Sequence, residues 1–265
     1  MAAKWLFTTV DNPGASTSPN SYLRGINDDG TLLGGNQASS SPSGARAFVG
    51  TPDDFTTLNP PFSSPSDPVG PITPGGINNN GSVVGTDVHG ASGLHLFTYQ
   101  GGSYTELRLS SDTAGNGIND NGDIVGTLGS EGFLDVNGNF STFQVPGAAQ
   151  TIPEDVNDHG RIVGTYTAAD GSQHGFYGQP GRLHHLDVPG AIATALYGEN
   201  VRGDMVGSYM DGSGKMHGLI DHQGKITTLD IPGAVSTTAY GVNGNGEVVG
   251  GYTDLAGVEH GFTAT

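Results

Sequence analysis

One ten-residue pattern recurs six times along this chain, and its clearest copy is GINDNGDIVG at residues 117–126. Each copy contains an Asn, a Gly three residues later, and then a pair of mostly aliphatic residues. We call these asparagines the anchor asparagines; they are Asn27, Asn78, Asn119, Asn157, Asn200 and Asn243, with spacings of 51, 41, 38, 43 and 43 residues. A repeat of about 40 to 45 residues is typical of a four-stranded propeller blade. The pattern therefore predicts an all-β, six-bladed propeller.

The Asn-x-x-Gly segment of each repeat predicts a tight hairpin between the first two strands of a blade. Glycine adopts the left-handed backbone conformation without a steric penalty, and an Asn side chain can accept hydrogen bonds from the backbone of the turn. The segment also faintly resembles a calcium loop, but the closing Glu and the full set of oxygen ligands are missing. We therefore favour a structural hairpin.

The two ends of the chain predict how the ring closes. The last repeat stops at residues 259–263, which form a third strand without a fourth. Residues 7–15 near the N-terminus match residues 226–234, which contain the fourth strand of the fifth repeat. We expect an N-terminal strand at about residues 5–11 to complete the last blade, so that residues 1–265 form a single propeller domain. This closure removes the free strand edges that favour aggregation.

The composition excludes several classes of partner. A formal net charge of −17 with only nine Lys and Arg residues would repel phosphate groups, so we expect no nucleic-acid partner. No long apolar segment is present, so we expect neither membrane insertion nor a signal peptide within this chain. The absence of Cys excludes disulfides and thiolate chemistry. We expect a monomer.

Several motifs resemble those of the bacterial extracellular HAF-repeat proteins. They are the segments 174–176, 217–219 and 260–262 (HGF, HGL and HGF), the more divergent 46–48, 95–97 and 131–133, the Gly-Ile-Asn hairpins and the Val-Pro-Gly-Ala turns at 145–148 and 188–191. The resemblance covers essentially the whole chain and implies a secreted or cell-surface location. It supplies no catalytic residues. The repeated His174, His217 and His260 are interpreted as structural hydrogen-bonding groups.

A candidate site lies where the repeats disagree. Three residues before the anchor asparagine, at position −3, the six repeats carry Arg24, Gly75, Asn116, Glu154, Tyr197 and Tyr240. Because the first strand of a propeller blade is the innermost, these side chains would form a polar pocket near the mouth of the channel; neutral variation is the alternative. Position −1 is Ile or Val in five repeats and Glu199 in the fifth. A buried carboxylate is costly unless it is paired or functional, and Arg202 or Arg24 could be its partner.

Two long loops, at residues 36–44 and 60–74, could form the wall of a cavity between blades one and two, although tolerated insertions are the alternative. Their sequences are rich in Ser and Pro, whereas the corresponding connections in the other repeats are shorter.

Two main functions are compatible with this pocket. By analogy with six-bladed paraoxonases and gluconolactonases, Glu154, Asn116 and Glu199 would bind a divalent cation, and the oxygen ligands favour calcium. Glu154, Glu199 or His159 would then act in the hydrolysis of an ester, lactone or phosphotriester, with Arg24, Asn116, Tyr197 and Tyr240 binding the substrate. The alternative is a non-enzymatic secreted propeller that binds a glycan, another small molecule or a protein. A structural repeat protein of the cell envelope is also compatible with the sequence.

Overall fold

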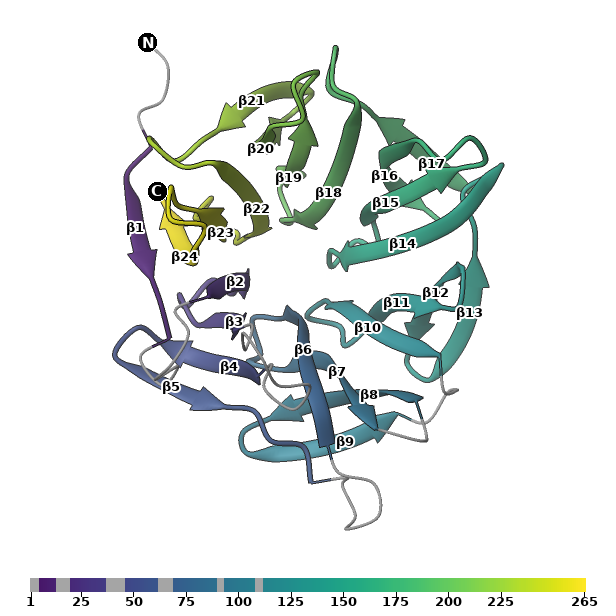
Figure 1. The fold of residues 1–265 in the computed structure, drawn as a ribbon. Coiled ribbons are helices and arrows are strands. Elements are labelled where there is room, and N and C mark those ends of the chain that lie inside the picture. Colours follow the sequence, from purple (N-terminus) through teal and green to yellow (C-terminus); the bar gives the residue numbers. More distant parts are fainter. Residues whose placement is uncertain (1–4, 13–19, 37–45, 62–68, 90–92, 108–111) are drawn as a thin grey trace.

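The computed structural model describes residues 5–12, 20–36, 46–61, 69–89, 93–107 and 112–265, and it confirms the predicted six-bladed propeller. Six antiparallel sheets of four strands are arranged as a ring, which Figure 1 shows. The loop segments 37–45 and 62–68, which contain most of the predicted cavity wall, lie outside the described residues.

The strands of each blade run in sequence from the innermost outwards. Blade one contains β2 (Ser21–Ile26), β3 (Leu32–Asn36), β4 (Arg46–Thr51) and β5 (Asp54–Thr57). Blade two contains β6 (Val69–Ile77), β7 (Val83–His89), β8 (Gly93–Gln100) and β9 (Ser103–Leu107). Blade three contains β10 (Thr113–Ile118), β11 (Ile124–Leu128), β12 (Glu131–Val136) and β13 (Asn139–Phe143).

The second half of the ring follows the same order. Blade four contains β14 (Ala148–Val156), β15 (Ile162–Ala168), β16 (Gln173–Gln179) and β17 (Arg182–Leu186). Blade five contains β18 (Ala193–Glu199), β19 (Met205–Met210), β20 (Met216–His222) and β21 (Lys225–Leu229). Blade six contains β22 (Ser236–Val242), β23 (Val248–Thr253), β24 (Glu259–Ala264) and the N-terminal strand β1 (Phe7–Val10).

Strand β1 closes the ring as the sequence predicts. It pairs antiparallel with β24, with Phe7 opposite Ala264 and Val10 opposite Gly261. Backbone hydrogen bonds between Leu6 and Thr265 extend this pairing by one residue. The outer edge of blade six is therefore occupied by the beginning of the chain.

Within blade four, a Phe and a Gly face each other across neighbouring strands. The side chain of Phe176 on β16 is fully buried against Gly164 on β15. A Cβ atom at Gly164 would lie 2.2 Å from the carbonyl oxygen of Ile152 and 2.8 Å from the Phe176 ring, so only glycine fits there. Separate apolar clusters fill the spaces between neighbouring blades, as where Phe176 packs with Val125 of blade three.

The repeated histidines form hydrogen bonds within the sheets, in agreement with their structural interpretation. In blade five, Nδ1 of His217 lies 2.8 Å from Asp230, and its ring stacks on Tyr209 with the ring centres 5.0 Å apart. His174 and His260 make the corresponding contacts with Asp187 and Asp11.

Candidate functional site: the axial pocket

The anchor asparagines form a ring around the axis of the propeller. Each one begins a tight turn; in blade three, for example, Asn119 accepts a hydrogen bond from the backbone N–H of Gly122, whose φ is +84°. The side-chain Oδ1 of Asn119 also accepts the backbone N–H of Asp123, as the capping argument predicts.

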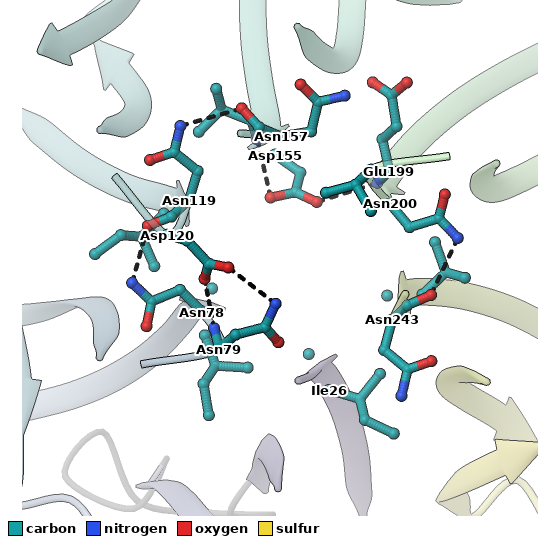
Figure 2. Close-up of a pocket in the computed structure, with 18 of the residues that line it drawn as sticks. Ile26, Asn78, Asn79, Asn119, Asp120, Asp155, Asn157, Glu199, Asn200 and Asn243 are labelled. Atoms are coloured by element: carbon teal, nitrogen blue, oxygen red, sulfur yellow. Dashed lines mark hydrogen bonds between the residues drawn. The ribbon is translucent and has the colours of Figure 1, made fainter. Parts of the chain in front are cut away.

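The side-chain amides of five of the six anchor asparagines then join each blade to the next one. Nδ2 of Asn78 donates to the main-chain oxygen of Asn119 at 2.8 Å, and Nδ2 of Asn119 donates to that of Asn157 at 3.1 Å. Asn200, Asn243 and Asn27 make the same bond to the next blade. Figure 2 shows part of this ring, which the sequence analysis did not foresee because it is made of contacts between repeats.

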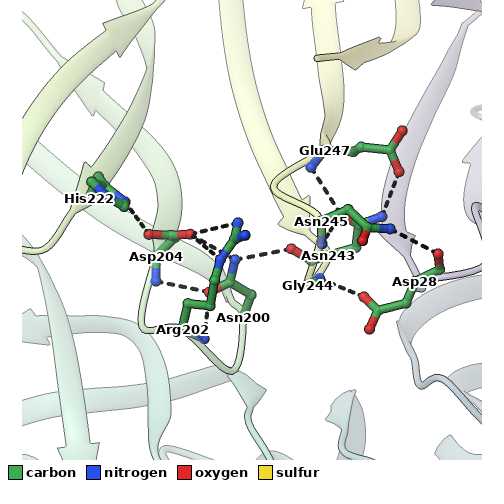
Figure 3. A network of polar contacts seen from close by, with 9 residues as sticks. All are labelled: Asp28, Asn200, Arg202, Asp204, His222, Asn243, Gly244, Asn245 and Glu247. Carbon is green, nitrogen blue, oxygen red and sulfur yellow. Dashed lines mark hydrogen bonds and ion pairs between the residues drawn. The ribbon is translucent and has the colours of Figure 1, made fainter.

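A second layer of hydrogen bonds lies at position +1, one residue after the anchor asparagine. The backbone N–H groups of Asp28, Asn79 and Asp120 each donate to the side chain at position +1 of the following blade. The backbone N–H of Gly244 donates to Asp28, so the layer continues from blade six to blade one, as Figure 3 shows.

A β-bulge directs the side chain at position −3 towards the axis. In five of the inner strands the strand pairing skips the residue at position −3: Arg24, Asn116, Glu154, Tyr197 and Tyr240. In β6 the irregular pairing spans Gly75 and Gly76. A bulge re-aims the extra side chain, which explains why these residues point out of the sheet and line the cavity.

An ion pair crosses the axis between opposite blades. The guanidinium of Arg24, from blade one, bonds to the carboxylate of Glu154 in blade four, and both side chains are largely buried. The guanidinium also lies 5.7 Å and 5.6 Å from the ring centres of Tyr197 and Tyr240. Burial opposes the charge of Arg24, but Glu154 and the two tyrosines outweigh it and raise the pKa of the guanidinium. Arg24 therefore stays charged beside the Glu154 carboxylate and the two tyrosine rings.

These layers enclose a cavity of about 100 Å³ on the axis, lined by residues from all six blades. Its mouth is acidic, because Asp28, Asp120 and Asp158 lie there. Arg24 is the one Lys or Arg side chain among the described residues that line the cavity, and it is already paired with Glu154.

The junction between blades four and five differs from the others. Asp155 stands at position −2, where the other five repeats have glycine, and its Oδ2 accepts the backbone N–H of Glu199 at 3.0 Å. The side chain of Glu199 is completely buried, and its Oε1 lies 3.0 Å from Nη1 of Arg161. The guanidinium of Arg161 lies 4.8 Å from the ring centre of Tyr177, and its Nη2 lies 3.4 Å from the sulfur of Met205.

Burial changes the acidity of both carboxyl groups at this junction. It raises the pKa of Glu199 to about 8, although Arg161 opposes the shift. It raises the pKa of Asp155 to about 6, although the backbone N–H groups of Glu199 and Val156 lower it. Both groups therefore take up protons much closer to neutrality than exposed carboxylates do.

The predicted site residues are not all brought together. Arg24, Glu154, Tyr197 and Tyr240 meet on the axis, and Asn116 lines the same cavity but donates its Nδ2 to the main-chain oxygen of Pro153. The partner of Glu199 is Arg161, which corrects the expectation of Arg202 or Arg24; Arg202 instead pairs with Asp204.

His159 is exposed on the hairpin of blade four and does not line the cavity.

The three predicted metal ligands each have a different protein partner. Glu154 binds Arg24, Glu199 is paired with Arg161, and Asn116 bonds to the backbone. Within the described ranges no group of three or more His, Asp or Glu side chains is placed to hold a metal ion.

The sequence analysis missed Asp155 and Arg161. Position −2 carried a clear signal, because one Asp replaces a glycine that the other five repeats share. Arg161 stands four residues after its anchor asparagine, where the other repeats have Thr, Ser, Asp or Glu. The two exceptions and Glu199 become informative together, because all three lie at one junction.

Comparison with known proteins supports the fold and leaves the family open. No protein-family model matches the sequence, and no match is found among characterised protein sequences. A TolB-like protein from Agrobacterium tumefaciens has a TM-score of 0.63 and 10% identity, with 98% of this chain and 97% of that chain covered.

Fucose-binding propellers are also among the similar structures. The six-bladed Aleuria aurantia lectin has a TM-score of 0.53 and 12% identity, covering 92% of this chain and 90% of the lectin. The SapL1 lectin, solved with α-methyl fucoside, has a TM-score of 0.56 and 10% identity over 90% of each chain. At these identities the chain is similar to them in fold: it is a six-bladed β-propeller.

Proposed function

We propose that this protein is a binding propeller that takes one small, uncharged and hydroxyl-rich ligand, such as a single sugar unit, in the axial pocket. The observation that carries the proposal is the set of bulged residues at position −3. They place an ion pair and two tyrosines around one cavity, and they differ from blade to blade. Repeated residues maintain the blades, so the position where the repeats differ is the better candidate for recognition.

The size and charge of the pocket support this class of ligand. The cavity of about 100 Å³ is open at its mouth, so it can enclose part of one monosaccharide unit and not a longer chain. The acidic mouth repels anions, and the guanidinium of Arg24 already lies against the tyrosine rings where a ligand cation would bind. Hydroxyl groups, which both donate and accept hydrogen bonds, match the remaining amide, phenol and carboxylate groups.

The hydrolase interpretation has less support. The carboxylates of Glu154 and Glu199 are held by two different arginines, and His159 lies outside the cavity. The similar lectin structures also agree better with a binding protein, although they share only 10–12% identity with this chain. A secreted or cell-surface location, implied by the HAF-repeat resemblance, belongs to the same proposal, since surface glycans are found there.

A glycoside-binding assay tests the proposal. We expect isothermal titration calorimetry with a panel of neutral methyl glycosides to find binding at micromolar to millimolar affinity. The variants Tyr240→Phe and Glu154→Gln, which keep the shape of the pocket, should weaken binding about tenfold, the loss of roughly one hydrogen bond. Tyr209→Phe is the matched control, because its hydroxyl bonds to Thr228 away from the axis. No binding of any glycoside at 10 mM, or equal effects in the control, would refute the proposal.

Metal analysis separates the two functions. Elemental analysis after exhaustive dialysis, together with glycoside titrations in a chelator, should show that binding needs no divalent cation. About one tightly held ion per chain, with ester or lactone turnover that disappears in the chelator, would instead restore the hydrolase.

A further inference from the structure

The hydrogen-bonded layer at position +1 is incomplete. At four of the six junctions the backbone N–H at this position donates to an Asp or Asn side chain of the next blade, over 2.6–2.8 Å. The acceptors are Asn79, Asp120, Asp158 and Asp28. Blade five has Val201 at this position and blade six has Gly244, and neither side chain has an oxygen. The layer is therefore open on both sides of blade five.

At the junction of blades four and five, three kinds of hydrogen bond that join blades elsewhere in the ring are missing among the described residues. Val201 offers no acceptor to the backbone N–H of Asp158, and no described residue accepts a hydrogen bond from Nδ2 of Asn157, although the other anchor asparagines donate to the next blade. At position +2, Asn80, Asn121 and Asn245 bond to the next blade, whereas His159 occupies this position in blade four. All three contacts are missing at this junction among the described residues, whereas the junction of blades five and six keeps the bond from Nδ2 of Asn200.

The residues at this junction whose polar groups lack these hydrogen bonds line the axial cavity. Asn157, Asp158, Asn200 and Val201, which we call the open notch, all line it. Val201 is 45% exposed, which is unusual for an aliphatic residue on a polar rim. The notch offers N–H donors from blade four, a main-chain acceptor from Asn200 and an apolar surface from Val201.

We propose that an uncharged oxygen of the ligand binds in the open notch and replaces the side-chain oxygen that Val201 does not supply. This inference rests on the proposed function, and it assigns the orientation of the ligand. A ligand hydroxyl accepts a hydrogen bond from the Asp158 backbone or from Nδ2 of Asn157, and it donates to the main-chain oxygen of Asn200. The C–H groups beside this hydroxyl pack against Val201, while the rest of the ligand extends towards Tyr197, Tyr240 and Glu154.

The charges around the notch exclude a carboxylate or phosphate in this role. The carboxyl groups of Asp155, Asp158 and Glu199 line the cavity together with the notch residues. Arg161 is the cation at this junction, and it is paired with Glu199. A negatively charged ligand would therefore be repelled by Asp155 and Asp158, whereas a hydroxyl would not.

Filling the notch from within the protein tests the inference. Val201→Asn restores the side-chain oxygen that Asn79 provides at the equivalent position of blade two. We expect this variant to melt a few degrees higher than the wild type and to bind the best glycoside of the panel at least tenfold more weakly. Val201→Ala is the control: it removes the apolar group without adding an acceptor, so it should not raise the melting temperature.

The outcomes separate this inference from the proposed function. In ¹⁵N-labelled wild-type protein, the glycoside should shift the Asp158 backbone amide and the Asn157 side-chain amide signals. If Tyr240→Phe weakens binding but Val201→Asn does not, the pocket binds the ligand and the notch assignment is wrong. If no glycoside binds, the proposed function fails. If Val201→Asn melts no higher than Val201→Ala, then the junction does not lack a hydrogen-bond acceptor at position 201, and the inference is wrong whether or not a glycoside binds.

Discussion

Two junctions of the ring hold their blades together by different kinds of contact. One lies between blades two and three, and the other lies between blades four and five. The first consists of neutral amide and backbone contacts made by Asn78, Asn79 and Asn80, supplemented by the Asp120 carboxylate. The second depends on the buried acids Asp155 and Glu199 and on Arg161. Neutral hydrogen bonds hold neighbouring blades together at any ordinary pH. A buried ionic junction adds cost and pH sensitivity, so its presence at one position of a regular ring indicates a specialised region.

The largest expected effect comes from removing the cation of the ionic junction. Arg161→Met leaves the buried carboxyl of Glu199 without a partner, and at pH 9 we expect the free energy of unfolding to fall by about 3–5 kcal/mol. At pH 5 the loss should be smaller, because Glu199 is then protonated. Urea denaturation at both pH values measures the difference. The double variant Arg161→Met/Glu199→Ile, which restores the aliphatic residue typical of position −1, should recover most of the stability. Equal losses at the two pH values would contradict the ionic description.

Glu199 should make a distinct contribution to the pH dependence of stability. Its pKa is raised to about 8 in the folded protein, above the value of about 4.5 expected in the unfolded chain. Its stabilising contribution is therefore fully present below pH 4.5 and is lost as the pH rises through about 8. We expect the melting temperature of Glu199→Gln to fall less than that of the wild type between pH 5 and pH 9.

The isosteric variant Glu199→Gln is needed as a reference because other groups also lose stabilising contributions as the pH rises. His217 and His260 also have raised pKa values, through their hydrogen bonds to Asp side chains, although burial opposes the shift. Their contributions are likewise lost as the pH rises, but they are common to the wild type and to Glu199→Gln. Parallel profiles would show that Glu199 does not titrate in this range.

A smaller effect compares two anchor asparagines. Asn78→Ala removes two contacts within its turn and one bond to blade three, whereas Asn157→Ala removes the turn contacts alone. We expect Asn78→Ala to be more destabilising than Asn157→Ala by about 1 kcal/mol, the net value of one hydrogen bond. Denaturant midpoints with a common slope measure this difference. Equal midpoints would show that the bond between blades adds nothing measurable.

The smallest expected effect is that of His159→Ala. The side chain is exposed outside the cavity, so stability should change by less than about 0.5 kcal/mol and glycoside binding should be unchanged. A loss of ligand binding or of any detected turnover in this variant would instead support the catalytic role predicted for His159.

The fold was predictable because its signals are local and repeated. Each hairpin carries its own asparagine and glycine, and the match between residues 7–15 and 226–234 identified the closing strand. The bonds that join blades could not be predicted in this way, because Asn78 and its acceptor Asn119 belong to different repeats. The partner of Glu199 was missed for the same reason: Arg161 is distant in sequence and becomes its neighbour through the packing of two blades.

The pairing of β1 with β24 also affects how the chain can fold during synthesis. Strand β1 is made before any blade, yet its partner appears only after the other strands have left the ribosome. Until then the N-terminal segment has no native partner, and blade six lacks its outer strand. The pairing brings together residues about as far apart in sequence as this fold allows, and such contacts form slowly. Completion of the ring thus reports that translation has reached the last strand, and a chain released early would expose an unpaired edge to quality control.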